Sequence, residues 1–392
     1  MIIKYFKIAC KIVHALAYYY CTLLIPKDKK LWVFGSWKGK SYSDNSKALF
    51  EYVSKEHKEI NAVWIAKNEK VYNEVLSLGF NVVRYSSFTS KILVARAKVS
   101  VQTESNEDTG RFRVGGTKVI QLFHGAAAVK EVHLFHGMSK IKKALVKIYA
   151  DNHTKSYWMV ASDYYLHRYP LLVEADPQRI YVTGQPRTDV VLEYRKSPFL
   201  EEYISTHGKK KLIIYAPTHR NYGAGKHLMF SPEEWLRFDD FLGKENYILF
   251  FKPHPNEIEL YKEQFNDYKN ILLVDERLSL PKDSCEYLHY FDLLISDYSS
   301  IASDFIILNK PLIHFMFDFD HFADEDFTLD SVDKFVGGPI CKNWNDLFDS
   351  IKDSLDNDSY YDKRQYALKR AYKYVDRRNC ERVYDRILEI IK

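Results

Sequence analysis

Histidines, cations and hydroxyl side chains follow several short apolar runs of this chain, and these side-chain types suit phosphate chemistry. His124 follows VIQLF, Thr218 and Arg220 follow LIIYA, and Lys252 and His254 follow YILFF. Arginine makes forked hydrogen bonds to phosphate oxygens, and imidazole can accept a proton near pH 7. The pattern therefore predicts a site that holds a phosphorylated ligand beside a candidate general base.

Two further segments place hydroxyl and basic side chains after apolar runs. Ser299 and Ser300 follow FDLLISDY and precede a predicted helix over 301–308, where hydroxyls and free backbone N–H groups would face an anion. A plain helix cap is the alternative interpretation of these serines, and the neighbouring cations favour the phosphate site. Arg187 lies in GQPR after IYVT and belongs to the cations at the strand ends, with a simple tight turn as the alternative interpretation of this segment.

Short apolar runs alternate with amphipathic segments along the chain, and this rhythm predicts parallel sheets covered by helices. The expected strands are 31–34, 62–65, 81–84, 98–102 and 118–123 in a first series, and 212–216, 247–251, 271–274, 291–296 and 311–315 in a second. Helices are expected over 46–55 and 71–78. Ligands bind at the carboxyl ends of the strands in such sheets, so the segments with chemistry should meet at these ends.

The length of 392 residues suits two or three domains. We expect the α/β class, with two Rossmann-like domains facing each other across a cleft. Residues 26–205 would form the first domain and residues 206–392 the second, connected through the charged segment 193–211. The chain beyond about residue 359 is helical in period and predicts closing helices that pack back on the first domain.

Residues 1–25 predict an amphipathic helix. Polar side chains recur in it at spacings of three and four, which places them on one face, namely Lys4, Lys7, Lys11, His14 and Tyr18. The apolar run over 12–25 is too short to span a bilayer, and no small-residue cleavage site of a signal peptide follows it. We expect a helix lying in the plane of a membrane surface. A helix packed on the protein's own core is the alternative.

The composition argues against several classes of protein. With 57 basic and 52 acidic residues, the formal charge of +5 is too small to indicate nucleic-acid binding, and we expect no nucleic-acid partner. Five dispersed cysteines without a CxxC pair predict reduced thiols in a cytosolic compartment. The sequence contains no Walker A, GxGxxG, GxSxG or HExxH motif. This argues against the common ATPases, dehydrogenases, serine hydrolases and metalloproteases.

A metal site has little support in the sequence. The nearest approaches to a ligand pair are His133 with His136 and Asp318 with Asp320. The acidic loop 318–326 could hold a divalent ion, but such a loop is more often a solvated face. We therefore expect neither a metal nor another cofactor.

Seven segments occur in one order along the chain: GKSYSDNSKALFEY, QLFHG, VTGQPRTDVVL, YAPTHR, FKPHP, LLISDYSSIASDFIILNKPLIHFMFD and VGGPI. Together they fall within residues 31–355 and resemble the CDP-glycerol glycerophosphotransferase family of teichoic-acid primases and polymerases. Tyr42, Asp44 and Asn45 stand at matching positions of the opening segment. After the His-Gly pair the family usually continues Thr-Pro-Leu-Lys, whereas this chain has three alanines and a valine before Lys130.

This resemblance implies the GT-B arrangement of two Rossmann-like domains and a peripheral enzyme at the cytoplasmic face of the cell membrane. It implies transfer of an alditol phosphate, glycerol phosphate first, from a CDP-alditol such as CDP-glycerol, with release of CMP. The acceptor would be a hydroxyl of a polyprenyl-diphosphate-linked saccharide or of a growing teichoic-acid-type polymer. The first domain would handle this acceptor and the second the CDP donor.

The resemblance also implies roles for the residues at the strand ends. His124 would be the general base for the acceptor hydroxyl, with His254 next in line. The donor would be held by a shared set of cations and hydroxyls, namely Arg187, Thr218, Arg220, Lys252, His254, Ser299 and Ser300. Asp297 would orient its neighbours, and Glu286 would accept from the ribose hydroxyls. Without a metal, the cations would neutralise the developing charge.

Two alternatives belong to other classes of protein. A GT-B glycosyltransferase acting on a nucleotide sugar would share the fold and the diphosphate site. A non-enzymatic membrane-surface protein would share the amphipathic helix, but the histidines, arginines and serines at the strand ends speak against it. Glycerol or ribitol donor, primase or polymerase role, acceptor identity and oligomeric state all stay open at this point.

Overall fold

A computed structural model of the chain describes residues 2–125, 130–131, 137–140, 143–144, 153–208, 210–219, 230–319, 328–329 and 335–392. The chain divides into two compact units. The first consists of residues 1–125, 132–189 and 372–392, and the second of residues 126–131 and 190–371. Most of the second unit is therefore inserted between two parts of the first.

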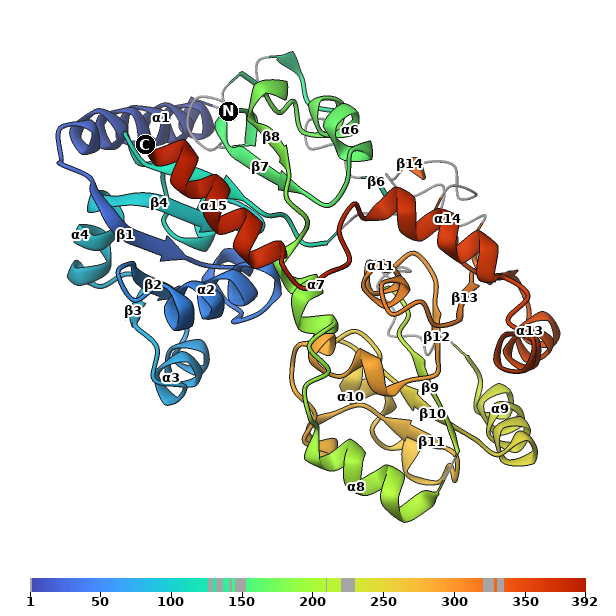
Figure 1. Ribbon diagram of the computed structural model, residues 1–392. Coiled ribbons are helices and arrows are strands. Elements are labelled where there is room, and N and C mark those ends of the chain that lie inside the picture. Colours follow the sequence, from blue (N-terminus) through green and yellow to red (C-terminus); the bar gives the residue numbers. More distant parts are fainter. Residues whose placement is uncertain are drawn as a thin grey trace. The chain divides into compact units, whose positions relative to one another are not determined.

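The first unit is built on a parallel sheet of seven described strands (Figure 1). In spatial order they are β3 (Val82–Arg84), β2 (Asn61–Ala66), β1 (Asp28–Phe34), β4 (Ala97–Gln102), β5 (Lys118–Gln121), β7 (Tyr157–Val160) and β8 (Ile180–Val182). Val33, Phe34 and Trp64 are fully buried, as expected of a parallel sheet covered on both faces. The strand order reverses between β1 and β4, and ligand crevices of such sheets open at the carboxyl ends beside this point.

Helices of the first unit turn apolar stripes toward its sheet. They are α1 (Ile2–Leu23), α2 (Asp44–Glu56), α3 (Glu69–Ser77), α4 (Phe88–Arg96), α6 (Tyr164–Leu172), α7 (Pro186–Val191), which leads into the second unit, and α15 (Asn379–Ile391). Leu49 and Val53, one turn apart on α2, are fully buried, and Val383 and Ile387 repeat this spacing on α15. The two helices pack side by side (Figure 1).

The second unit has its own parallel sheet, with six described strands. In spatial order they are β11 (Ile271–Leu273), β10 (Tyr247–Phe251), β9 (Lys211–Tyr215), β12 (Leu293–Ser296), β13 (Leu312–Phe315) and β15 (Ile340–Cys341). A short antiparallel ribbon pairs β6 (Lys130–Glu131) with β14 (Thr328–Leu329). The strand order again reverses, here between β9 and β12, which predicts a second crevice at the carboxyl ends.

The described helices of this unit are α8 (Pro198–His207), α9 (Pro232–Glu245), α10 (Ile258–Tyr261), α11 (Ile301–Ile306), α13 (Trp344–Asp356) and α14 (Tyr361–Ala371). Helix α9 begins with a capping box, in which the side chains of Ser231 and Glu234 each accept a hydrogen bond from the other's backbone N–H. Trp235 and Phe238 follow in the next turn and are fully buried in the core beside the sheet.

Ten expected strands are confirmed within a few residues of their bounds, whereas the expected series did not include β6, β7, β8, β14 and β15. The expected strand 118–123 ends earlier, at Gln121, because Phe123 adopts a left-handed conformation (φ 55°) that turns the chain toward His124.

The bounds of the two units differ from the expected domain bounds 26–205 and 206–392. Helix α15 packs on the first unit, as its expected role in closing the fold suggested, and α8 belongs to the second.

The carboxyl-terminal half of α1 packs against the first unit. The rings of His14 and Tyr18 lie 5.0 and 5.9 Å from that of Phe112, and the Thr22 hydroxyl accepts a hydrogen bond from the Gly115 backbone at 2.8 Å. A side chain at Gly115 would collide with the α1 backbone, so glycine permits this close approach. The alternative of a helix packed on its own protein therefore holds for this half of α1.

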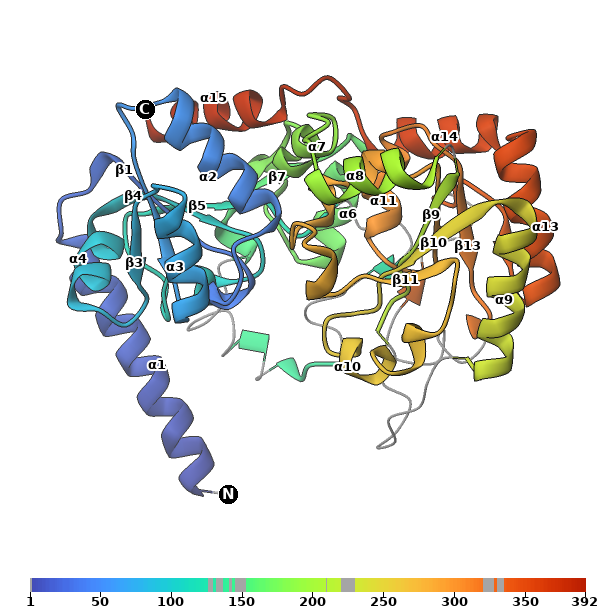
Figure 2. The same cartoon turned by 90° about the horizontal axis from the view of Figure 1, so that it is seen from below.

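The amino-terminal half of α1 extends beyond the sheet (Figure 2). Farther along the helix, apolar side chains on the face turned away from Phe112 stay open to solvent, with Val13 exposed by 67% and, just past the helix, Leu24 by 86%. No helix in the described part of the chain has the length and apolar character needed to cross a bilayer.

Candidate functional site

Asn45 joins three segments at the carboxyl edge of the first sheet. Its side chain is fully buried; the amide nitrogen donates to the Phe123 carbonyl and the amide oxygen accepts from the Arg187 backbone N–H, both at 3.0 Å. The residue before His124 and the start of α7 are thereby tied to the first turn of α2. This explains why the SDN, FHG and QPR segments come together in the fold.

Arg187 is held as a buried cation in this cluster. Its guanidinium lies 3.2 Å from the Asp44 carboxylate, and both side chains are more than nine-tenths buried. Gly125 (φ 99°) lies so close that an added Cβ would be 2.6 Å from an Arg187 nitrogen. Glycine is therefore required after His124 for both its conformation and its lack of a side chain.

His124 is half-buried between aromatic rings, with the Trp37 ring centroid at 5.2 Å and the Phe123 ring at 4.0 Å. Within the described part of the chain its Nδ1 is buried and has no hydrogen-bond partner. Burial lowers the pKa of His124, with Arg187 lowering it further and Asp44 opposing. The ring is therefore neutral near pH 7 and able to accept a proton.

Helix α15 supports the turn that carries Arg187. Asp189 accepts hydrogen bonds from the backbone N–H groups of Asn379 and Cys380 at 3.1 and 2.7 Å, and so caps the start of α15. The Asn379 side chain donates to Thr188 and Asp189 and fills the space over Gly184, where a Cβ could not fit. The Gly-Gln-Pro-Arg segment is thus clamped by the far end of the chain.

The carboxyl edge of the second sheet is organised by Asp297, which is buried after β12. Its carboxylate accepts from the backbone N–H of Thr218 at 2.9 Å, from the Thr218 hydroxyl at 2.7 Å and from the backbone N–H of Tyr298 at 2.6 Å. These bonds fix the ends of the neighbouring strands β9 and β12. Asp297 therefore connects the ends of two strands at this edge, and its role in binding the donor stays a prediction.

Lys252 and two histidines lie at the ends of β9 and β10. Burial lowers the pKa of Lys252, while the charges of Asp283 and Cys285 oppose this shift. His219 lies 2.9 Å from the Glu257 carboxylate, and its ring centroid is 5.0 Å from that of His254. The pKa of His254 is lowered by burial and by the charges of His219 and Lys252.

Other predicted site residues have different outcomes. Ser299 and Ser300 stand at the start of α11, where the Ser299 hydroxyl accepts weakly from the Ile301 N–H at 3.5 Å. The Glu286 carboxylate is 3.3 Å from the Arg195 guanidinium, so an ion pair occupies the group expected to bind ribose. Arg220 lies outside the described residues.

Several residues of these clusters had no sequence signal of their own. Asn379 and Asp283 lie in charged segments without a recognisable motif, and Glu257 follows KPHP by two residues. Among the described residues, no group of three or more His, Cys, Asp and Glu side chains is arranged to hold a metal. The candidate pair His133 and His136, the alanines after the His-Gly pair and most of the acidic loop 318–326 lie outside the described residues.

Residues 17–389 match the family CDP-Glycerol:Poly(glycerophosphate) glycerophosphotransferase, and the chain belongs to this family. The teichoic acid ribitol-phosphate polymerase TarL of Staphylococcus aureus is 30% identical over 70% of this chain and 48% of its own length. The teichoic acid glycerol-phosphate transferase of the same species is 28% identical over 83% of this chain and 84% of its own.

The solved structure of the wall teichoic acid polymerase TagF has a TM-score of 0.74 to this chain, at 21% identity, over 99% of this chain and 98% of the other. The α/β fold with two parallel sheets is thereby confirmed. The chain spans about half the length of the ribitol-phosphate polymerases that it matches.

Proposed function

We propose that this chain transfers an alditol phosphate, glycerol phosphate first, from a CDP-alditol to a hydroxyl of a lipid-linked saccharide or growing polymer, with release of CMP. Its product would belong to teichoic acid or a related cell-surface polymer. The observation that carries this proposal is the family match over residues 17–389, which includes the polar clusters at the carboxyl edges of both sheets. The GT-B arrangement of the two units is part of the proposal.

In the first unit, His124 would take the proton from the acceptor hydroxyl. Its lowered pKa keeps the imidazole neutral near pH 7, so that the ring can accept a proton. A general base of this kind contributes about 10²–10⁴ to the rate. Asn45 and Gly125 would act as positioning residues, since they fix the turn on which His124 stands.

In the second unit, Lys252, His254 and the two serines would hold the CDP diphosphate, with Thr218 fixed by Asp297 beside them. An arriving diphosphate would stabilise the protonated form of Lys252, whose pKa burial lowers in the free protein. Transfer of a phosphoryl group relies mainly on positioning and on neutralising developing charge. Arg220 and Arg187 would add to this neutralisation.

Work at the cytoplasmic face of a membrane is part of the same proposal, because the acceptor carries a lipid. The exposed apolar side chains of α1 and the lysines of its first turns support it. Each lysine near an anionic surface contributes about 1 kcal/mol, so changing Lys4, Lys7 and Lys11 together to Glu should strongly weaken vesicle binding. Liposome flotation measures this binding, and a variant that floats as well as the parent would contradict the in-plane helix.

The deciding experiment is a CMP-release assay with CDP-glycerol and CDP-ribitol and a defined lipid-linked acceptor. A parallel screen of nucleotide sugars separates the glycosyltransferase alternative, which would form a glycosidic bond. Release of CMP that depends on the acceptor supports the proposal. Turnover of a nucleotide sugar alone would refute it.

A further inference from the structure

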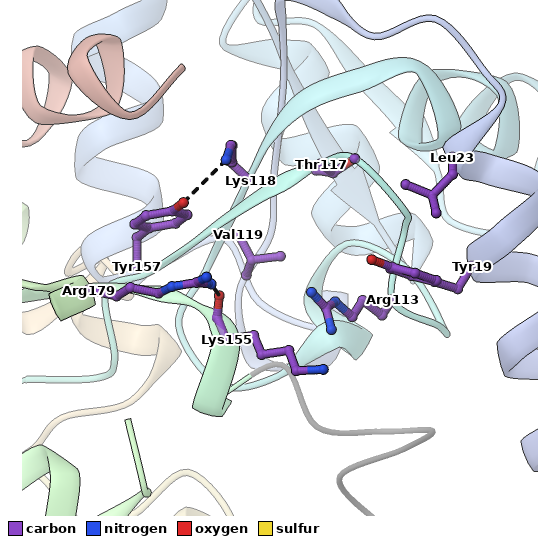
Figure 3. A pocket seen from close by; sticks show the side chains of 10 residues that line it. Tyr19, Leu23, Arg113, Thr117, Lys118, Val119, Lys155, Tyr157 and Arg179 are labelled. Carbon is purple, nitrogen blue, oxygen red and sulfur yellow. Dashed lines mark hydrogen bonds between the residues drawn. The ribbon is translucent and has the colours of Figure 1, made fainter. Parts of the chain in front are cut away.

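A cavity of about 240 Å³ opens in the first unit between α1 and the sheet (Figure 3). Tyr19 and Leu23 of α1 form one side of it, and Tyr157 and Arg179 form the other. Its volume is about eight times that of one water molecule in the liquid, which is room for a phosphate with an ester substituent.

The cavity is strongly basic. Its lining includes two arginines and two lysines and no carboxylate among the described residues, namely Arg113, Lys118, Lys155 and Arg179. Asp176, outside the lining, lies 3.4 Å from Arg179 and offsets one of these charges. Guanidinium and ammonium groups that converge on one space favour an anion, and arginine is suited to the forked contacts of a phosphate.

Hydrogen bonds within the wall hold these groups ready for a ligand. Lys118 donates to the Tyr157 hydroxyl at 3.2 Å, which leaves the phenolic O–H of Tyr157 free to donate to an anion (Figure 3). Arg179 donates to the Lys155 carbonyl at 2.7 Å and lies over the Tyr157 ring. The guanidinium of Arg113 lies 5.1 Å from the Tyr19 ring centroid.

This cavity is not the transfer site. Lys118 and Tyr157 begin strands β5 and β7, and Arg179 precedes β8, so the cavity lies at the amino ends of the strands. His124 follows the carboxyl end of β5, up to about 20 Å of extended chain away from Lys118. A ligand in the basic cavity would therefore bind apart from His124.

We propose that the cavity binds the phosphodiester headgroup of an anionic phospholipid, whose acyl chains lie along the exposed apolar side chains of α1. Leu23 belongs to both surfaces, since it lines the cavity and is 45% exposed, and Leu24 continues the apolar face. Charge complementarity selects the anionic headgroup, and the adjoining apolar face selects a lipid over a free phosphate. The proposal rests on the membrane association proposed above, but not on the transfer reaction.

Two variants of the full chain test the pocket. Lys118→Gln with Lys155→Gln should bind vesicles containing phosphatidylglycerol about 30-fold more weakly than the parent. Tyr157→Phe keeps the charge and should weaken the same binding about fivefold through the lost hydroxyl. Binding to vesicles of phosphatidylcholine alone should be weak for the parent and the variants alike.

A matched control removes the same charge elsewhere in the unit. Lys58→Gln with Lys70→Gln changes exposed lysines near β2 and α3, several strands from the cavity and beyond the Debye length of about 8 Å. This variant should bind within about twofold of the parent. If it loses as much as the cavity variant, or if Tyr157→Phe has no effect, diffuse surface charge explains the binding and the pocket proposal is wrong.

Calorimetry with monomeric dihexanoyl phosphatidylglycerol, glycerol phosphate and inorganic phosphate separates the sources of the anion. Tighter binding of the short-chain lipid supports the proposal, and equal binding of a soluble phosphate overturns the lipid assignment. CMP release with a detergent-soluble acceptor is measured on the same proteins and should not change in the cavity variants. Failure of the parent to release CMP would refute the transfer reaction and leave the vesicle results to decide the pocket.

Discussion

Replacing Asn45 by alanine tests whether the geometry around His124 depends on one buried amide. The change leaves the Phe123 carbonyl and the Arg187 N–H without the partners they have at 3.0 Å. A buried polar group deprived of its partner costs about 1–3 kcal/mol, so the two together cost about 4 kcal/mol. In a unit of this size that should lower the melting transition by roughly 10 °C. Calorimetry measures the melting temperature of each variant. The matched control is Asn81→Ala at an exposed position, whose free energy of unfolding should stay within about 0.5 kcal/mol of the parent.

The same substitution should slow CMP release by about 10²-fold, because a shift of about 1 Å in the base is enough for such a loss. Asn45→Asp keeps an acceptor for the Arg187 N–H and adds a negative charge near His124. It should raise the pKa of His124 and move the acid limb of the pH–rate profile to higher pH. If Asn45→Ala loses stability while turnover and the pH profile of both variants stay unchanged, Asn45 holds only the fold and the positioning argument fails.

Three further predictions concern the reaction itself. His124→Ala should lower turnover by about 10²–10⁴ and leave donor affinity unchanged, whereas Thr218→Val should weaken donor binding. Calorimetric titration of CDP-glycerol into each variant measures the donor affinity. Loss of donor binding in His124→Ala would assign this histidine to the phosphate site instead. The base must be neutral and burial lowers the pKa of His124, so activity should be lost only as the pH falls through a value below 6.5. Asp44→Asn removes a charge that raises this pKa and should move the acid limb of the pH–rate profile lower still. An acid limb above pH 6.5 in the parent would contradict the assignment. The purified enzyme should keep its activity in EDTA, and a loss restored by magnesium would place the acidic loop 318–326 in the active site.

Strands of this protein are readable from the sequence where both faces of the sheet are covered. The run YILFF became β10 with unchanged bounds, because five consecutive buried residues leave a continuous apolar signal. β15 has two residues, Ile340 and Cys341, and only one is buried, so the strand is too short to show an apolar pattern in the sequence. The early end of β5 depends on the left-handed conformation of Phe123, which is unusual for an aromatic residue.

The site was predictable as a set of strand ends, but not as a set of partners. Because His124 follows β5, the sequence places it at the carboxyl edge of the sheet. The sequence does not show that Asn45 holds the neighbouring residue Phe123, which lies 78 residues away along the chain. Glu286 has a suitable side chain for ribose, and only the fold brings Arg195 to its carboxylate. Such pairings are set by tertiary packing, which leaves no periodic trace in a single sequence.

The return of α15 to the first unit has a consequence for synthesis on the ribosome. Asp189 and the α15 residue that it caps, Asn379, are 190 residues apart, and nearly the whole second unit is made between them. At about 5–20 residues per second, the first sheet waits roughly 10–40 s for the helix that covers part of it. The six-stranded parallel sheet of the second unit comes from one continuous stretch of the chain, so this sheet can finish folding in that interval. During translation the order of completion is therefore the reverse of the order of the sequence, and the nascent chain exposes the uncovered face of the first sheet to chaperones or aggregation for that time.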